Sequence, residues 1–136
     1  MYTAVNIRAA SAYKLVALET SVAGADAHQL INLLFDALLQ SLVNAKGAMA
    51  RKDIPTKGRE IGRAVTYLEE GLKGGLNLQD GGDLALKLQA VYDYCLRRLT
   101  QANIKNDIQL LDEVIHLIEP LASGWKQIRA RIQSGG

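Results

Sequence analysis

The sequence contains few of the residues that break helices or cross-link chains. Among 136 residues there are two prolines, one cysteine and only 5% aromatic residues. So few prolines leave almost the whole chain able to form long helices, and the low aromatic content argues against a β-sandwich. The single Cys95 excludes an internal disulfide and a cysteine-rich metal site, which fits a reducing compartment. We expect Cys95 to be buried.

An excess of one charge and a long apolar run are also missing. Sixteen Lys and Arg residues oppose fourteen Asp and Glu residues, a formal charge of +2, which is far below the basic footprint of a dedicated nucleic-acid binder. No apolar run has the length of a membrane span, and Arg8, Lys14 and Glu19 interrupt the first 21 residues, unlike a signal peptide. We expect a soluble, cytoplasmic, single-core protein with no nucleic-acid partner and no membrane insertion.

Four long stretches have the apolar periodicity of helices. They cover about residues 26–51, 56–78, 83–102 and 107–132, with Asp26, Thr56 and Asp107 as expected N-caps and glycine, aspartate and asparagine clusters between them. Short connections make successive helices antiparallel. The sequence therefore predicts an all-α, antiparallel up-down four-helix bundle over residues 26–132. Residues 1–25 are expected to form an N-terminal arm or short extra helix, and residues 133–136 a flexible tail.

The first of these helices has an unusually wide apolar face. A normal core stripe is followed around the side of the helix by further apolar residues, namely Phe35, Leu39, Leu42 and Val43. We expect one bundle core to leave this second set uncovered, so that the arm, a second subunit or a partner helix would cover it.

Catalytic and metal-binding alternatives rest on weak motifs. Glu113 and His116 form the Glu-x-x-His step of di-iron bundles, but no second such step is present, and we expect His116 to be exposed to solvent. Neither His116 nor His28 has the neighbouring lysine and glycine of a phosphotransfer histidine. No nucleophile triad or phosphate-binding loop can be assembled either. A metalloenzyme or phosphotransfer bundle remains the alternative; we expect no enzyme activity, no metal and no cofactor.

Three local features carry structural expectations. Asp93 precedes Arg97 by four residues, a spacing that favours an ion pair on a helix surface. Pro120 lies inside the fourth helix, where it removes a backbone hydrogen bond and should cause a kink. Tyr92 falls on the core stripe of the third helix, so we expect it to be structural.

A long ungapped stretch resembles a known family. Residues 92–99 read Tyr-Asp-Tyr-Cys-Leu-Arg-Arg-Leu, and residues 101–107 read Gln-Ala-Asn-Ile-Lys-Asn-Asp. This stretch resembles the signature of the FliS family of flagellar export chaperones. The resemblance extends to residues 1–4, 28–31, 34–36, 71–73, 75–76 and 125–128, and so covers essentially the whole chain.

The resemblance implies a four-helix bundle that binds the disordered C-terminal segment of flagellin in the cytosol. Such a chaperone blocks premature polymerisation of flagellin and helps to present it to the flagellar type III export gate, without ATPase activity. A flexible client would fold along apolar grooves as it binds. Some relatives also bind flagellar regulatory proteins, and a homodimer through exposed apolar surface stays open.

The same resemblance directs attention to particular residues. In similar proteins the N-terminal arm lies over part of the groove and moves when flagellin arrives. The matching positions here are Tyr2, Ile7 and Tyr13, although the arm is a few residues longer between Ala4 and Tyr13. The predicted set that binds flagellin or caps the groove comprises Tyr2, Ile7, Tyr13, Phe35, Leu39, Leu42, Val43, Tyr94 and Arg98.

Overall fold

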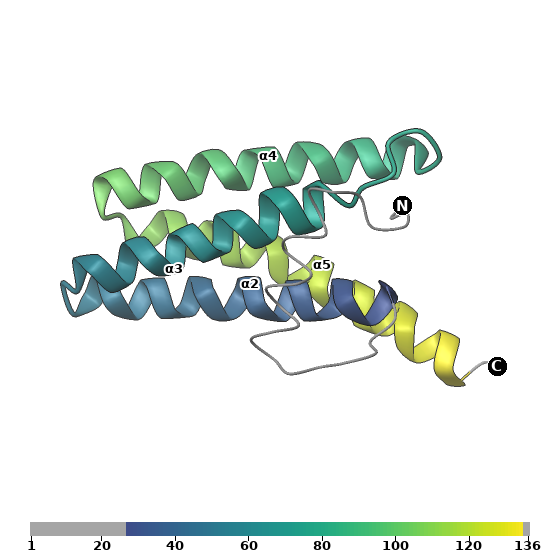
Figure 1. The fold of residues 1–136 in the computed structure, drawn as a ribbon, viewed down its shortest axis with the longest axis horizontal. Helices are drawn as coiled ribbons and strands as arrows, with labels where there is room; N and C mark the ends of the chain where they lie inside the picture. Colours follow the sequence, from purple (N-terminus) through teal and green to yellow (C-terminus); the bar gives the residue numbers. More distant parts are fainter. Residues whose placement is uncertain (1–26, 135–136) are drawn as a thin grey trace.

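The computed structural model describes residues 27–134, and side chains up to residue 128. Over this range the elements are α2 (Ala27–Ala50), α3 (Ile54–Thr66), the π-helical η1 (Tyr67–Lys73), α4 (Gly82–Lys105) and α5 (Ile108–Ser134), with no β-strand. The helices alternate in direction, and the α2–α3 and α4–α5 turns lie at the same end of the bundle (Figure 1). The prediction of an all-α helical bundle is confirmed. None of the described helices is apolar over a stretch long enough to cross a membrane.

The packing of helix α2 against its neighbours changes the interpretation of its wide apolar face. The helix packs against α3, η1 and α5. Phe35 and Leu42 are therefore buried, with 2% and 0% of their surfaces exposed, and Leu39 packs half-buried against the same core. Only Val43, 54% exposed, faces solvent. The expectation of an uncovered second apolar set was wrong for Phe35 and Leu42, because α2 is flanked by α5 and by α3 with its continuation η1, and the residues that face these two neighbours together make a wide apolar arc.

The second helix begins earlier than expected. Asp53, and not Thr56, is its N-cap: the Asp53 carboxylate accepts a hydrogen bond from the backbone N–H of Thr56 at 3.2 Å. The Thr56 side chain, and then this backbone hydrogen bond, lower the pKa of Asp53. Pro55 lies in the first turn, where a missing N–H costs nothing. Thr56 is thus an ordinary first-turn residue, because the aspartate three positions before it is also a strong cap.

The second helix also ends earlier than Leu78. After Thr66 it widens into the π-helical turn η1, and the N–H of Gly74 bonds to the carbonyl of Glu69, five residues back, at 2.9 Å. The wide turn brings the backbone close to Gly74, where a Cβ atom would lie 2.4 Å from the carbonyl oxygen of Glu70. Only glycine fits there. The chain leaves the helix at this point, before the apolar pattern stops.

The crowding at Gly74 and the open space at Gly62 predict opposite effects when each glycine is replaced by alanine. Gly74→Ala should lower the free energy of unfolding by about 1–3 kcal/mol, because the new methyl group meets a backbone carbonyl that cannot move away cheaply. Gly62→Ala, in the interior of α3 with nothing within 4 Å of the place where its methyl group would lie, should raise it by about 0.5–1 kcal/mol. Urea unfolding of both variants measures the two signs. A stable Gly74→Ala protein would contradict the close approach.

The α4–α5 connection is shorter than expected. Residues 103–105 belong to α4, and Asn106 alone ends the helix in the left-handed conformation, with φ 53° and its N–H bonded to the carbonyl of Ala102. Asparagine tolerates this conformation better than most residues. Asp107 accepts a bond from the N–H of Gln109 at 3.0 Å, which confirms it as the cap of the next helix. Buried Lys57 of α3 donates to the Asn103 carbonyl at 2.9 Å and to the Asn106 side chain.

Two residues of α4 that we expected to be buried lie in the core. Tyr92 and Cys95 are fully buried, and burial, followed by the charge of Glu113, raises the pKa of the Cys95 thiol to about 11. The expected Asp93–Arg97 pair is wrong: Asp93 pairs with Lys73 of η1 at 2.6 Å. Packing of η1 beside α4 offers Asp93 a partner outside its own helix. Helix α5 continues through Pro120.

Candidate partner-binding site

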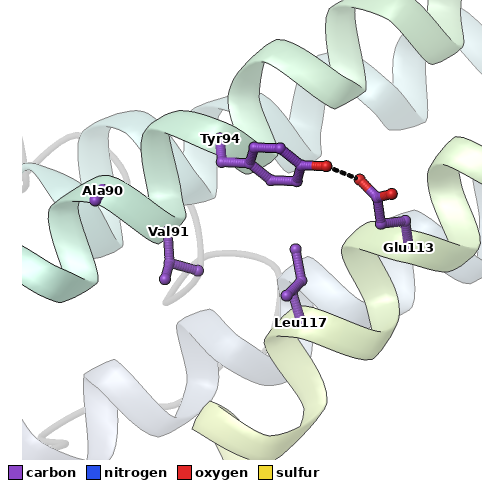
Figure 2. A pocket seen from close by; sticks show the side chains of 5 residues that line it. All are labelled: Ala90, Val91, Tyr94, Glu113 and Leu117. Atoms are coloured by element: carbon purple, nitrogen blue, oxygen red, sulfur yellow. Dashed lines mark hydrogen bonds between the residues drawn. The ribbon is translucent and has the colours of Figure 1, made fainter.

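An open pocket lies between α4 and α5 and is almost entirely apolar. Its volume is about 500 Å³, and its walls are Ala90, Val91 and Tyr94 of α4 with Glu113 and Leu117 of α5. Figure 2 shows the Val91 and Leu117 side chains facing each other across it, with the Tyr94 ring above. We call this the α4–α5 pocket. The apolar residues that line it are half-buried or exposed, so they contact water when no partner is bound.

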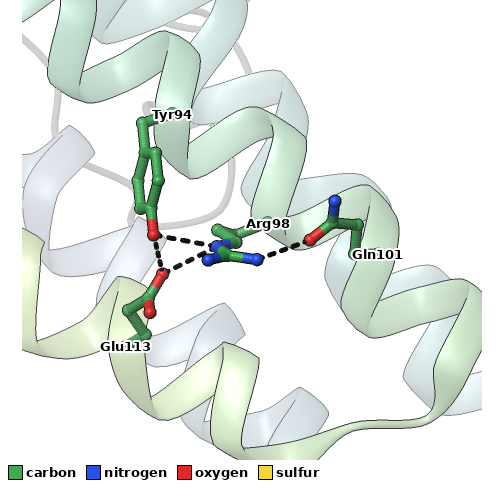
Figure 3. Close-up of polar contacts among 4 residues, drawn as sticks. All are labelled: Tyr94, Arg98, Gln101 and Glu113. Atoms are coloured by element: carbon green, nitrogen blue, oxygen red, sulfur yellow. Dashed lines mark hydrogen bonds and ion pairs between the residues drawn. The ribbon is translucent and has the colours of Figure 1, made fainter.

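A polar network lies at the edge of this pocket. The Tyr94 hydroxyl donates to Glu113 Oε1 at 2.6 Å, and Arg98 Nε lies 2.9 Å from both of those oxygens. Arg98 Nη1 also donates to Gln101 Oε1 at 2.8 Å (Figure 3). Because Tyr94, Arg98 and Gln101 are spaced by three or four residues, they share one face of α4. The network ties α4 to α5 and holds the tyrosine ring over the pocket.

Protonation in this network follows its hydrogen bonds. The Tyr94 hydroxyl, and then the positive charge of Arg98, hold the pKa of Glu113 below its ordinary value. The same hydroxyl and the Glu113 charge raise the pKa of Arg98. Both shifts favour the charged forms, so Glu113 and Arg98 form an ionised pair to which the Tyr94 hydroxyl is hydrogen-bonded.

The lowered pKa of Glu113 predicts an acid-sensitive contribution to stability. A carboxyl with a lower pKa in the folded than in the unfolded chain stabilises the fold above its ordinary value of 4.5, and this contribution is lost as the pH falls through the folded pKa. Glu113→Gln should therefore flatten the decline of melting temperature between about pH 5 and pH 3. The matched control is Glu119→Gln, a carboxylate on the exposed side of α5. Equal acid profiles for the wild type and Glu113→Gln would contradict the network.

A second apolar pocket lies farther along the same helix pair, toward the start of α4. Its volume is about 190 Å³, and we call it the Trp125 pocket; it is lined by Phe35, Leu84, Leu88, Tyr92, Pro120, Leu121, Gly124, Trp125 and Ile128. Trp125 Nε1 donates a hydrogen bond to the His28 carbonyl at 2.9 Å. The Trp125 ring also stacks on the His28 ring, with 4.0 Å between the ring centroids. Leu84 and Ile128 of its lining are 55% and 45% exposed, so part of this apolar surface is open to solvent.

The arrangement fits binding better than chemistry. Both pockets are apolar clefts between packed helices, and the groups at their edges are already paired with one another. His116 is exposed, as expected, and Glu113 of the Glu-x-x-His step is held by Tyr94 and Arg98. Within residues 27–134 no three metal-binding side chains gather into a cluster. An apolar cleft with a polar edge is the kind of surface that takes the apolar face of a partner helix.

The structure distributes the predicted site residues over different places. Tyr94 and Arg98 come together at the α4–α5 pocket, and Phe35 lines the Trp125 pocket from the core side. Leu42 packs in the core and Leu39 half-buried against it, and Val43 is exposed on α2 outside the described pockets. Tyr2, Ile7 and Tyr13 lie outside the described residues, so their roles stay predictions.

Sequence reasoning missed most of the pocket walls. Ala90, Val91 and Leu117 of the α4–α5 pocket were not among the predicted site residues. Leu117 and Leu86 are apolar residues on otherwise polar faces, 36% and 54% exposed. Single apolar residues on an otherwise polar helix face were the signal in the sequence that could have indicated an exposed binding surface.

Comparison with known proteins identifies the family. The model of the family described as flagellar protein FliS matches residues 9–132. The flagellar secretion chaperone FliS of Salmonella typhimurium is 42% identical over 94% of this chain and 93% of its own length. FliSB of Pseudomonas aeruginosa is 42% identical over 90% and 96%, and FliS of Bacillus subtilis is 30% identical over 86% and 83%. The chain therefore belongs to the FliS family of flagellar secretion chaperones, which are not enzymes.

Proposed function

We propose that this protein is a cytoplasmic export chaperone for flagellin. It binds the otherwise disordered C-terminal segment of flagellin, prevents premature polymerisation and assists delivery to the flagellar type III export apparatus. The observation that carries the proposal is the 42% identity, over nearly the full length of both chains, to a flagellar secretion chaperone.

The geometry of α4 and α5 supports this function. Two apolar pockets follow one another along these helices, the first on the Val91–Leu117 side and the second around Trp125. A disordered segment that folds into helices on binding can place apolar side chains in both and gain affinity from many modest contacts. The Tyr94–Arg98–Glu113 network offers hydrogen-bonding groups at the edge of the first pocket.

Calorimetric titration with the cognate flagellin tests the proposal. Full-length flagellin should bind one-to-one, and flagellin lacking its C-terminal segment should not bind. Burial of apolar surface should give a negative heat-capacity change. Binding that survives the truncation would place the recognised element elsewhere in flagellin, and absence of binding to either form would overturn the proposal.

A further inference from the structure

A pocket of about 400 Å³ lies at the end of the bundle that carries the α2–α3 and α4–α5 turns (Figure 1). It is lined by Met49, Lys52 and Ile54 around the first turn and by Asn106 of the second. We call it the turn pocket. None of these residues lines the α4–α5 pocket or the Trp125 pocket. A ligand here would therefore leave both of those pockets accessible.

Lys52 occupies a backbone position that glycine fits best. It follows the last turn of α2 with φ 61°, and the next N–H, that of Asp53, bonds back to the Ala48 carbonyl at 2.8 Å. Helices that end in this way usually have glycine at the left-handed position, because glycine has no Cβ to crowd it. Lys52 and Asn106 are the two residues other than glycine with positive φ in the described part of the chain, and both line the turn pocket. Asparagine tolerates this conformation, but the turn alone does not explain a lysine there.

Both polar side chains of the pocket present hydrogen-bond donors. Lys57 Nζ donates to Asn106 Oδ1. Because an ammonium can only donate, the amide oxygen must face Lys57, and Asn106 Nδ2 with its two N–H groups is left for another partner. The Lys52 side chain is exposed and makes no ion pair with another described residue. The turn pocket therefore offers N–H donors and a positive charge, and no carboxylate lines it.

The surroundings of the pocket are basic, and the rest of its lining is apolar. Residues 51–57 and 103–107 contain four Lys or Arg residues and two aspartates, and both aspartates already accept backbone N–H bonds as helix caps. Met49 and Ile54 supply the apolar lining, and Ile54 is 53% exposed. A complementary ligand brings a carboxylate for the donors and an apolar group beside it.

We propose that the turn pocket binds an acidic segment of a second partner protein, in which Asp or Glu adjoins a Leu, Ile or Met side chain. The carboxylate pairs with Lys52 and accepts a hydrogen bond from Asn106 Nδ2. The adjoining apolar side chain packs on Met49 and Ile54, which a bare phosphate group would leave in water. Since the pockets proposed for flagellin are formed by other residues, the second partner can bind while flagellin is held.

Titration of the full chain with blocked tripeptides tests this assignment. Glu-Leu-Glu is compared at matched ionic strength with Gln-Leu-Gln, which lacks the charge, and with Glu-Gly-Glu, which lacks the apolar group. The readout is the NMR signals of the Asn106 side-chain amide and the Ile54 methyl groups. Glu-Leu-Glu should give saturable shifts of both. Each altered peptide should bind about tenfold more weakly or worse, and inorganic phosphate should not saturate the site.

Variants of Lys52 separate binding from the shape of the turn. Lys52→Gln should abolish saturation by Glu-Leu-Glu. Lys52→Gly should do the same, although glycine relieves the left-handed backbone and should raise the melting temperature. Lys87→Gln removes an exposed cation from the first half of α4 and should leave the affinity unchanged. Shifts that stay linear with Glu-Leu-Glu, equal affinity for an altered peptide or for phosphate, or undiminished binding by the two Lys52 variants would overturn the proposal.

Discussion

Leu42→Ala is expected to lower the free energy of unfolding by about 2–5 kcal/mol. Leu42 is fully buried where α2 packs against its neighbours, so truncation leaves a cavity that the surrounding helices cannot fill. Urea unfolding monitored by circular dichroism measures the change. The folded variant should bind client with unchanged affinity, because the missing atoms lie in the core.

The next residue is a matched control for this substitution. Val43 is 54% exposed on the same helix, so Val43→Ala should change the free energy of unfolding by no more than about 0.5 kcal/mol. Similar stabilities for the two variants would mean that Leu42 is not in the core. Loss of client binding by a stable Leu42→Ala protein would restore the direct binding role predicted from the sequence.

Leu117→Gln should weaken binding of the flagellin C-terminal segment by about 30-fold or more, the effect of removing a central interface anchor. Leu117 forms one wall of the α4–α5 pocket and is 36% exposed, so a polar side chain of similar length should leave the fold intact but prevent an apolar partner residue from packing there. Glutamine also favours the helix, which separates the effect from helix propensity. Calorimetry on the folded variant gives the affinity.

Ile104→Gln is the control for Leu117→Gln. Ile104 is 75% exposed in the last turn of α4 and lines neither the α4–α5 pocket nor the Trp125 pocket. Its substitution removes more exposed apolar surface than Leu117→Gln does, yet should leave client affinity within about twofold, as expected for a residue outside the interface. If both variants lose affinity equally, general surface hydrophobicity and not the α4–α5 pocket controls binding.

The elements that could be predicted are those governed by local rules. Periodicity placed Tyr92 and Cys95 in the core of α4, and a capping aspartate, Asp107, marked the start of α5. The early end of the second helix could not be read in this way. It depends on the π-helical turn and on the fit of Gly74 against the Glu70 carbonyl, which are properties of the folded backbone.

The candidate site was likewise predictable from the sequence only in part. Tyr94 and Arg98 were identified because the family signature contains them, but their partner Glu113 comes from another helix and had been considered only as a metal ligand. The apolar face of α2 was visible in the sequence, yet its exposure was misjudged. Whether Leu42 meets solvent or a neighbouring helix depends on where α5, α3 and η1 lie around α2, and those positions are a property of the assembled bundle.

By itself the sequence determined the all-α class, the core stripes and the family, because helix periodicity, capping chemistry and a long ordered motif are all encoded along the chain. The tertiary structure decided which apolar residues remain exposed, how Glu113 is engaged and how Lys52 and Asn106 come to line one pocket. These features arise from contacts between helices. A one-dimensional pattern specifies which face of each helix is apolar, but the packing of neighbours determines how much of that face is covered.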